Sequence, residues 1–381
     1  MLTLLIPKET APGETRVSAT PDTLKPLTKL GFTVLVESGA GAAAQFDDED
    51  YRAASAEIVS SDGWARADYV AKVAPPTLEE VDRLQEGAVV ISFMTPERNL
   101  DVVARMRDRK VTSLGMELVP RVTRAQSMDA LSSQATVAGY KASLLAATHL
   151  KKMCPLLMTA AGTVPPAKVV IFGAGVAGLQ AIATCKRLGC VVEATDVRMA
   201  AKEQVESLGA RFIDVPGAAD MEDAGGYAKE ATPEFLAKQR EEVAKRVKEA
   251  DIVITTAQIP GRQAPMLVSE DIVREMQTGA VIVDMAVESG GNCEVSERGQ
   301  IVERHGVTIV GLSNLPATIP THSSELYAKN VSNLLKLFFN KEGQLEPDWE
   351  DEILAGAQLT RGGEVHHEPT AQALGSQEVN S

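Results

Sequence analysis

Three glycines at positions 173, 175 and 178 have the spacing G-x-G-x-x-G, a pattern whose chemistry is phosphate binding by backbone N–H groups. The pattern alone is a weak signal. Here an apolar run at 169–172 precedes it and a helix-forming run at 177–188 follows it. A dinucleotide-binding turn requires this strand–turn–helix context, so we interpret the segment as such a turn.

Each glycine of this turn has a separate physical task. Gly173 permits the tight turn, Gly175 lets the backbone approach a pyrophosphate, and Gly178 lets helix and strand pack closely. The helix that begins at Val176 and Ala177 presents N–H groups without intrahelical acceptors and the positive end of its dipole. We therefore expect these five residues to surround the phosphates of a bound dinucleotide.

Asp196 follows the next predicted strand, Val191–Thr195, about twenty residues after the glycines, where the motif requires an acid. Its carboxylate is expected to accept hydrogen bonds from the adenosine ribose and to repel a 2′-phosphate, which favours NAD(H) over NADP(H). Val197 and Arg198 complete this corner of the predicted site. Arg198 keeps the alternative open, because a nearby arginine can accommodate a 2′-phosphate.

These residues need a scaffold of parallel strands, and the rest of the chain has the pattern of one. Strand-like runs alternate with helical segments on both sides of an alanine-rich, helix-prone stretch at 136–150, which predicts βαβ units. A chain of 381 residues is also too long for one ordinary core. The expected strands are 2–6, 33–37, 69–73, 89–93, 111–116, 169–172, 191–195, 211–215, 252–255, 280–284 and 308–310.

We therefore predict an α/β fold of two Rossmann-like domains with parallel sheets. The N-terminal domain comprises residues 1–135 with a C-terminal return over 320–381, and the NAD(H)-binding domain comprises residues 136–319. The site is expected in the second domain and in the cleft between the two. The polar tail after Arg361 is expected to be loose.

Composition argues against several other classes of function. The formal net charge is −14, whereas nucleic-acid binding needs a basic face. The five histidines show no metal-ligand spacing, so we predict no metal site. The four cysteines contain no C-x-x-C pair, which is typical of reduced thiols in the cytosol. No apolar run is long enough to span a bilayer, so we expect no direct insertion into a membrane.

Further motifs give the chain a specific resemblance as far as Arg361. The sequence closely resembles the NAD(H)-binding component, domain I or separate alpha-1 subunit, of proton-translocating nicotinamide nucleotide transhydrogenases, which share a superfamily with alanine dehydrogenases. Besides the glycine turn, the motifs that carry the resemblance are 7–9 (PKE), 13–17 (GETRV), 124–129 (RAQSMD), 158–167 (MTAAGTVPPA), 194–198 (ATDVR), 225–230 (GGYAKE) and 286–293 (AVESGGNC).

The resemblance implies a reversible hydride transfer between NADH on this chain and NADP⁺ held by a partner subunit, coupled to proton movement across a membrane. It implies a homodimer that docks with NADP(H)-binding and membrane-spanning subunits. The chain itself is expected to be cytoplasmic and peripheral on the cytoplasmic face of the inner membrane. Proton translocation follows from the resemblance alone, since nothing in composition or spacing indicates it.

The resemblance assigns the nicotinamide end of the site to a loop that here contains Arg121, Gln126 and Asp129, with Ser132 just beyond. Hydride transfer between two nicotinamides releases no proton at the reacting carbons, so these residues are needed for positioning rather than as acid or base. Gln126 is expected to reach the partner's NADP(H) ribose or the carboxamide. Arg121 and Asp129 are expected to pair, and Ser132 to bond the carboxamide.

Two further positions are expected to contact the nucleotide. Tyr227, next to Gly226, matches the tip of the family's mobile loop, where an aromatic side chain covers the ligand and excludes water. Gln258 follows the predicted strand Ile252–Thr255, and ligands of open α/β sheets bind at the carboxyl ends of strands.

An alanine dehydrogenase is the strongest alternative, and a catalytically idle NAD sensor is the second. Arg16 and Lys72 match residues that bind the substrate carboxylate in alanine dehydrogenases. That reaction also moves a proton, and its histidine base follows the strand that here ends in Phe93, where the sequence continues Met-Thr-Pro. Asp284 comes near the other acid of that enzyme, but Met-Ala-Val-Glu follows it. The missing base favours the transhydrogenase.

Overall fold

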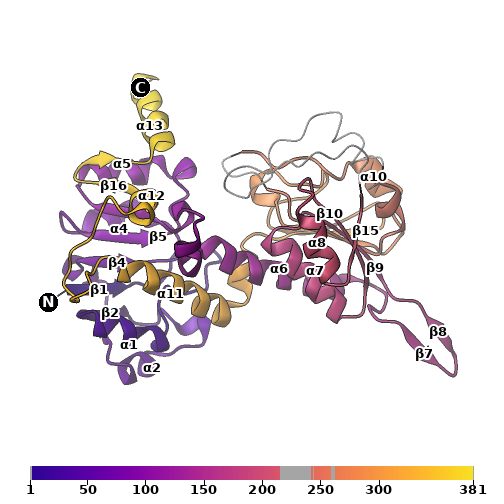
Figure 1. Ribbon diagram of the computed structural model, residues 1–381, viewed down its shortest axis with the longest axis horizontal. Helices are drawn as coiled ribbons and strands as arrows, with labels where there is room; N and C mark the ends of the chain where they lie inside the picture. Colours follow the sequence, from indigo (N-terminus) through magenta and orange to yellow (C-terminus); the bar gives the residue numbers. More distant parts are fainter. Residues whose placement is uncertain (1, 215–241, 243, 259–261, 381) are drawn as a thin grey trace. The chain divides into compact units, whose positions relative to one another are not determined.

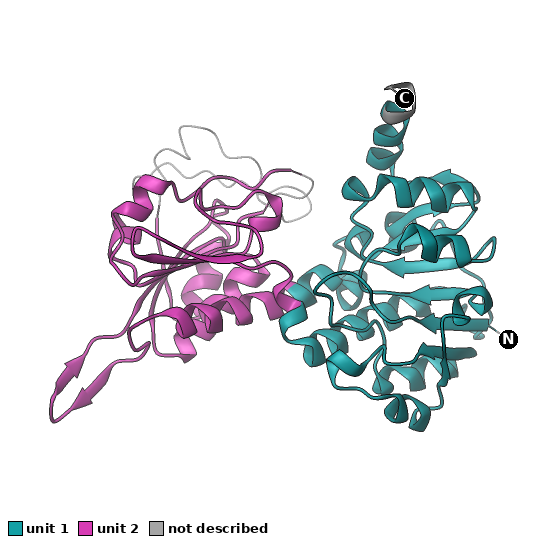
Figure 2. Cartoon of the chain, turned by 180° about the vertical axis from the view of Figure 1, so that it is seen from behind, with its two compact units in different colours: residues 1–134, 317–381 teal, residues 135–316 magenta. Residues whose placement is uncertain are grey.

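The computed structural model describes residues 2–214, 242, 244–258 and 262–380. The chain divides into two compact units, which Figure 2 shows in different colours. Unit 1 comprises residues 1–134 with 317–381, and unit 2 comprises residues 135–316. Each unit is a largely parallel sheet covered by helices on both faces, which confirms the predicted α/β fold class.

The sheet of unit 1 has the order β3-β2-β1-β4-β5-β6-β16-β17. The strands β1 to β6 are parallel, and the last two are antiparallel additions from the C-terminal return. Strand order therefore reverses between β1 and β4, as in doubly wound folds. The strands are β1 Leu2–Ile6, β2 Phe32–Glu37, β3 Glu57–Val59, β4 Tyr69–Ala71, β5 Val89–Ser92, β6 Thr112–Gly115, β16 Gln358–Arg361 and β17 Glu364–Val365.

Alternation along these buried strands feeds two cores, one on each face. Leu4 and Ile6 of β1 join a core with α1 (Pro21–Lys29), α11 (Pro320–Lys336) and α12 (Glu352–Ala357). Leu5 joins the opposite core with Trp64 of α3 and residues of α4 and α5. The remaining helices of the unit are α2 Asp48–Ala53, α3 Gly63–Arg66, α4 Leu78–Arg83, α5 Leu100–Asp108 and α13 Glu368–Asn380.

The chain after Arg361 differs from the sequence-based expectation. Instead of a loose tail, it forms β17 and then α13. Leu374 of α13 is 5% exposed and belongs to the core that contains α5. One apolar anchor on an otherwise polar helix is enough to seat the segment, and the sequence offers little sign of it.

The sheet of unit 2 has the order β11-β10-β9-β12-β13-β15-β14, all parallel except β14. Its order again reverses between the first strand, β9, and the fourth, β12, which is the arrangement of a dinucleotide-binding domain. The strands are β9 Lys168–Phe172, β10 Val191–Thr195, β11 Arg211–Phe212, β12 Ile252–Thr255, β13 Val281–Asp284, β14 Gln300–Arg304 and β15 Val307–Gly311.

Helices α6 (Ala130–His149), α7 (Val176–Arg187) and α8 (Ala201–Ser207) cover one face of this sheet, and α10 (Glu270–Arg274) belongs to the other core (Figure 1). A hairpin of β7 (Leu157–Thr159) and β8 (Gly162–Val164) extends away from the sheet (Figure 1). Short 3₁₀ helices are η1 Ala42–Ala44, η2 Pro96–Arg98, η3 Met116–Leu118, η4 Thr123–Met128, η5 Val287–Ser289 and η6 Leu315–Thr318.

Candidate functional site

The glycine turn lies between β9 and α7, at the point where the strand order of unit 2 reverses. Gly173 has a φ of +91°, a conformation that L side chains rarely adopt, and a Cβ there would come 2.5 Å from Thr256 Oγ1. A Cβ on Gly178 would overlap the carbonyl oxygen of Gly173. Both positions therefore need glycine for the tight packing of strand against helix.

Gly175 is surrounded differently. It is the N-cap of α7, and a Cβ there would meet no atom within 4 Å among the described residues. The first helical hydrogen bond runs from the Leu179 N–H to the Gly175 carbonyl at 2.8 Å, so the N–H groups of Val176, Ala177 and Gly178 have no helical acceptor. The turn is thus an open cradle of amides at the positive end of a helix, which suits a diphosphate.

Asp196 lies directly after β10, beside the glycine turn, and is 9% exposed. Its Oδ2 accepts the Ala174 N–H at 2.7 Å, which ties the carboxylate to the turn. Arg198 donates to it from the backbone N–H and from two guanidinium nitrogens, at 2.8 to 2.9 Å. Val197, between them, is half-buried. The acid and the amide cradle are therefore brought together as the spacing predicted.

The end of β12 forms the other wall of the turn. The Thr256 hydroxyl donates to the carbonyl of Phe172 at 3.0 Å, and the Gln258 side chain donates to the Met285 carbonyl at 2.9 Å. Gln258 is exposed at this edge. Asn292 fastens the segment by donating to the Ala257 carbonyl and accepting the Ala257 N–H, at 2.9 and 3.1 Å. The importance of Thr256 was missed in the sequence, because a threonine after a strand carries no signal of its own.

Asp284, at the end of β13, is a structural anchor. It is 1% exposed and accepts N–H groups of Ala286, Asn292 and Cys293 at 2.9 to 3.0 Å, with the Ser296 hydroxyl at 2.6 Å. Its oxygens are taken up in folding the loop that follows. This acid therefore organises the loop from which Asn292 reaches the site.

The loop with Arg121, Gln126, Asp129 and Ser132 lies in unit 1, around η4 and the start of α6. Arg121 and Gln126 are exposed. Asp129 accepts the Ser132 N–H at 2.8 Å and the Ser132 hydroxyl at 2.6 Å, so it caps α6. The nucleotide residues lie in unit 2, and Gly226 and Tyr227 lie outside the described residues.

Arg16 and Lys72, the pair that matches alanine dehydrogenases, are buried and held by carboxylates of this chain. Arg16 donates through Nε and Nη2 to the two oxygens of Glu14, at 2.8 and 2.6 Å. Lys72 donates to both oxygens of Glu80, at 2.8 and 2.9 Å. The two cations are 7% and 1% exposed, so each already has the kind of partner that a substrate carboxylate would be.

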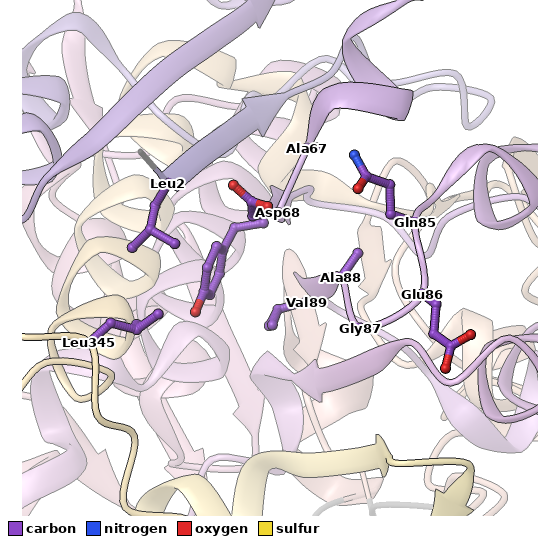
Figure 3. Close-up of a pocket in the computed structure, with 10 residues that line it drawn as sticks. Leu2, Ala67, Asp68, Gln85, Glu86, Gly87, Ala88, Val89 and Leu345 are labelled. Atoms are coloured by element: carbon purple, nitrogen blue, oxygen red, sulfur yellow. The ribbon is translucent and has the colours of Figure 1, made fainter.

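A small hollow in unit 1, of about 220 Å³, lies away from these residues (Figure 3). It is lined by Leu2, Tyr69 and Val89, which begin β1, β4 and β5, and by the loop around Gln85 and Glu86. Ligands of such sheets bind at the carboxyl ends of strands, and this hollow lies at the amino ends. It is therefore not a candidate for the nucleotide site.

Metal and membrane features are also absent from the part of the chain that the structure describes. In that part no group of three or more His, Cys, Asp or Glu side chains is arranged to hold a metal ion. Nor does any helix there combine the length and apolarity needed to cross a bilayer.

Family models match both units. The alanine dehydrogenase/PNT N-terminal domain matches residues 5–138, and the alanine dehydrogenase/PNT C-terminal domain matches residues 142–368. The chain belongs to the alanine dehydrogenase/PNT family. The family resemblance predicted from the motifs is thereby confirmed.

Within this family, the more similar relatives are transhydrogenases. The first of the separate alpha-subunit chains of the NAD(P) transhydrogenase from Rhodospirillum rubrum is 50% identical over 374 residues, with 96% of this chain and 97% of that protein covered. The structure of transhydrogenase from Sinorhizobium meliloti has a TM-score of 0.88 at 45% identity, covering 95% and 99% of the two chains. An L-alanine dehydrogenase structure has a TM-score of 0.81 at 25% identity, covering 98% and 99%. The chain is a component of an oxidoreductase enzyme.

Proposed function

We propose that this chain binds NAD(H) in unit 2 and exchanges a hydride with NADP(H) held by a partner subunit of a proton-translocating transhydrogenase. The observation that carries the proposal is the open amide cradle at Gly175 next to the buried carboxylate of Asp196. The names of relatives up to 50% identical support the same activity.

The residues present fit this cofactor. Its phosphates suit the N-terminal amides of α7, and its adenosine ribose suits the carboxylate of Asp196. The negative charge of Asp196 disfavours a 2′-phosphate at that position, which supports NAD(H) over NADP(H). When bound, the nicotinamide ring supplies the hydride acceptor or donor. The chain needs only to hold that ring for transfer, and exposed Gln126 on a loop fastened by Asp129 is suited to such positioning.

The direct test combines this chain with a transhydrogenase NADP(H)-binding subunit, NADH and an NADP⁺ analogue whose reduced form absorbs at a distinct wavelength. We expect reduction of the analogue only when both proteins are present. If NADH binds tightly but the analogue is not reduced with any competent partner, the chain acts as an NAD sensor instead.

Alanine oxidation is disfavoured by the charges of unit 1. A substrate carboxylate would have to displace Glu14 from Arg16 or Glu80 from Lys72, and both pairs are buried and bidentate. We expect no NADH formation from L-alanine and NAD⁺ by the purified chain. Turnover of alanine would overturn the proposed transhydrogenase function.

We also propose a homodimer that uses the β7–β8 hairpin. Every residue of the two strands is exposed, and Met158, Leu156 and Met153 are 75%, 55% and 46% exposed. A lone two-stranded hairpin is marginal in water, and apolar side chains on it favour burial against a second copy of this chain. The Met158→Asp variant is expected to sediment as a monomer, and the Thr163→Asp variant on the facing strand serves as a less apolar comparison. Dimers in both variants would remove the hairpin from the interface.

For the cellular location, we propose that the chain is cytoplasmic and associates peripherally with the inner membrane through its membrane-spanning partner subunits. The proposal rests on the transhydrogenase names of the relatives. Fractionation of cells with and without the partner subunits tests it. The chain is expected to move from the membrane fraction to the soluble fraction when those subunits are deleted.

A further inference from the structure

The carboxylate of Asp196 is fully hydrogen-bonded by its own chain. Two donors are backbone groups, the Ala174 N–H to Oδ2 at 2.7 Å and the Arg198 N–H to Oδ1 at 2.8 Å. Two more come from the Arg198 guanidinium, Nε to Oδ1 and Nη2 to Oδ2, both at 2.9 Å. A carboxylate accepts about four hydrogen bonds, so a ribose hydroxyl finds no vacant position on Asp196.

The two side-chain donors resemble a ribose in their geometry. The guanidinium places one N–H on each carboxylate oxygen, in the forked arrangement typical of arginine. The 2′- and 3′-hydroxyls of adenosine ribose form a similar pair of neighbouring donors. The guanidinium therefore occupies the two positions that the sugar needs.

The local backbone allows the side chain to leave without unfolding the turn. The Arg198 N–H stays bonded to Asp196, and the Arg198 carbonyl accepts the Ala201 N–H at 3.1 Å, at the start of α8. The Arg198 side chain is 18% exposed, against 6% for Asp196, so it borders solvent. After release, the two backbone donors still hold the carboxylate in its orientation.

We propose that Arg198 is a latch on the ribose subsite, which closes on Asp196 in the absence of nucleotide and opens when adenosine ribose binds. The inference rests on the proposed NAD(H) function and deepens it. Part of the free energy of each ribose hydrogen bond is spent on breaking an arginine–aspartate contact. The 2′-hydroxyl consequently adds less to affinity than a hydroxyl on an accessible carboxylate would.

The test compares NADH with its analogue that lacks the 2′-hydroxyl of the adenosine, by calorimetry at about pH 8, where carboxylates are ionised. The variants are Arg198→Met, which keeps an unbranched stem, and Lys202→Met. Lys202 pairs with Asp214 and serves as the matched loss of a nearby charge. We expect the ratio of the two dissociation constants to rise roughly tenfold in Arg198→Met and to stay at the wild-type value in Lys202→Met.

The outcomes separate the latch from the proposed function. If the wild-type chain does not bind NADH, the NAD(H) function is wrong. If it binds NADH but the ratio in Arg198→Met is unchanged or lower, the latch is wrong and the NAD(H) function stands. If Arg198→Met does not fold, a crystal structure of the wild-type complex decides: a guanidinium still forked on Asp196 beside bound ribose refutes the latch.

Discussion

The pH dependence of stability can be predicted from Glu9, a buried carboxyl of unit 1. Its Oε1 accepts the Val73 N–H at 2.6 Å, while its Oε2 has no hydrogen-bond partner among the described residues. The nearest cation, Lys72 Nζ at 3.8 Å, is already bound by Glu80. Burial therefore outweighs the attraction of Lys72 and raises the pKa of Glu9 from 4.5 to about 7.

The sign and size of the effect follow from proton linkage. Between pH 4.5 and about 7 the native protein keeps a proton on Glu9 that the unfolded chain releases, so stability falls as the pH rises through this range. A pKa difference of about 2.5 corresponds to roughly 3 kcal/mol. The Glu9→Gln variant resembles the protonated acid and cannot ionise, so it avoids this loss.

We expect Glu9→Gln to match the wild-type free energy of unfolding near pH 4.5 and to exceed it by ~3 kcal/mol at pH 8. Urea unfolding followed by tryptophan fluorescence is the assay, because both tryptophans, Trp64 and Trp349, lie in unit 1. Glu117, whose pKa burial also raises to about 7, is present in both proteins, so its effect cancels in the difference.

The matched control is Glu79→Gln, which changes an exposed acid on α4 and should give a difference that does not vary with pH. A Glu9→Gln variant that is less stable than the wild type at pH 8 would refute the reasoning. So would a difference that stays constant from pH 5 to pH 8, since that would mean Glu9 is ionised across the range.

Three further predictions concern the proposed nucleotide site. Gly175→Ala should weaken NADH binding at least tenfold with little change in melting temperature, because its Cβ has room in the protein but intrudes on the cradle, whereas Gly178→Ala should lower both, because its Cβ overlaps the Gly173 carbonyl; equal melting losses would contradict this. Asp196→Ala should weaken NADH binding by about 100-fold in calorimetry, and unchanged affinity would remove it from the ribose site. Gln126→Asn should slow hydride transfer far more than it weakens NADH binding, and equal losses in the two assays would argue against a positioning role.

Much of the fold could be predicted from the sequence because parallel strands buried on both faces are continuous apolar runs. The strands β1, β9, β10 and β12 were expected within one residue of their observed limits. The strands β3, β14 and β17 were not expected, since they are short or exposed and lie at sheet edges, where the apolar signal is weak. The tail helix α13 was missed for a related reason, because it is seated mainly by Leu374.

What the sequence alone determined is the local part of the site: the glycine spacing, the helix start at Val176 and the acid two residues before Arg198. These depend on backbone conformation within one βαβ unit, so residue type and spacing suffice. Only the tertiary structure decided which charged groups meet. Glu80 holds Lys72, Gln134 accepts from Arg16, and Thr256 closes on the glycine turn, although the last two pairs are more than eighty residues apart in the chain. Such pairings depend on the order of strands in the sheet and on burial, which the residue types by themselves do not encode.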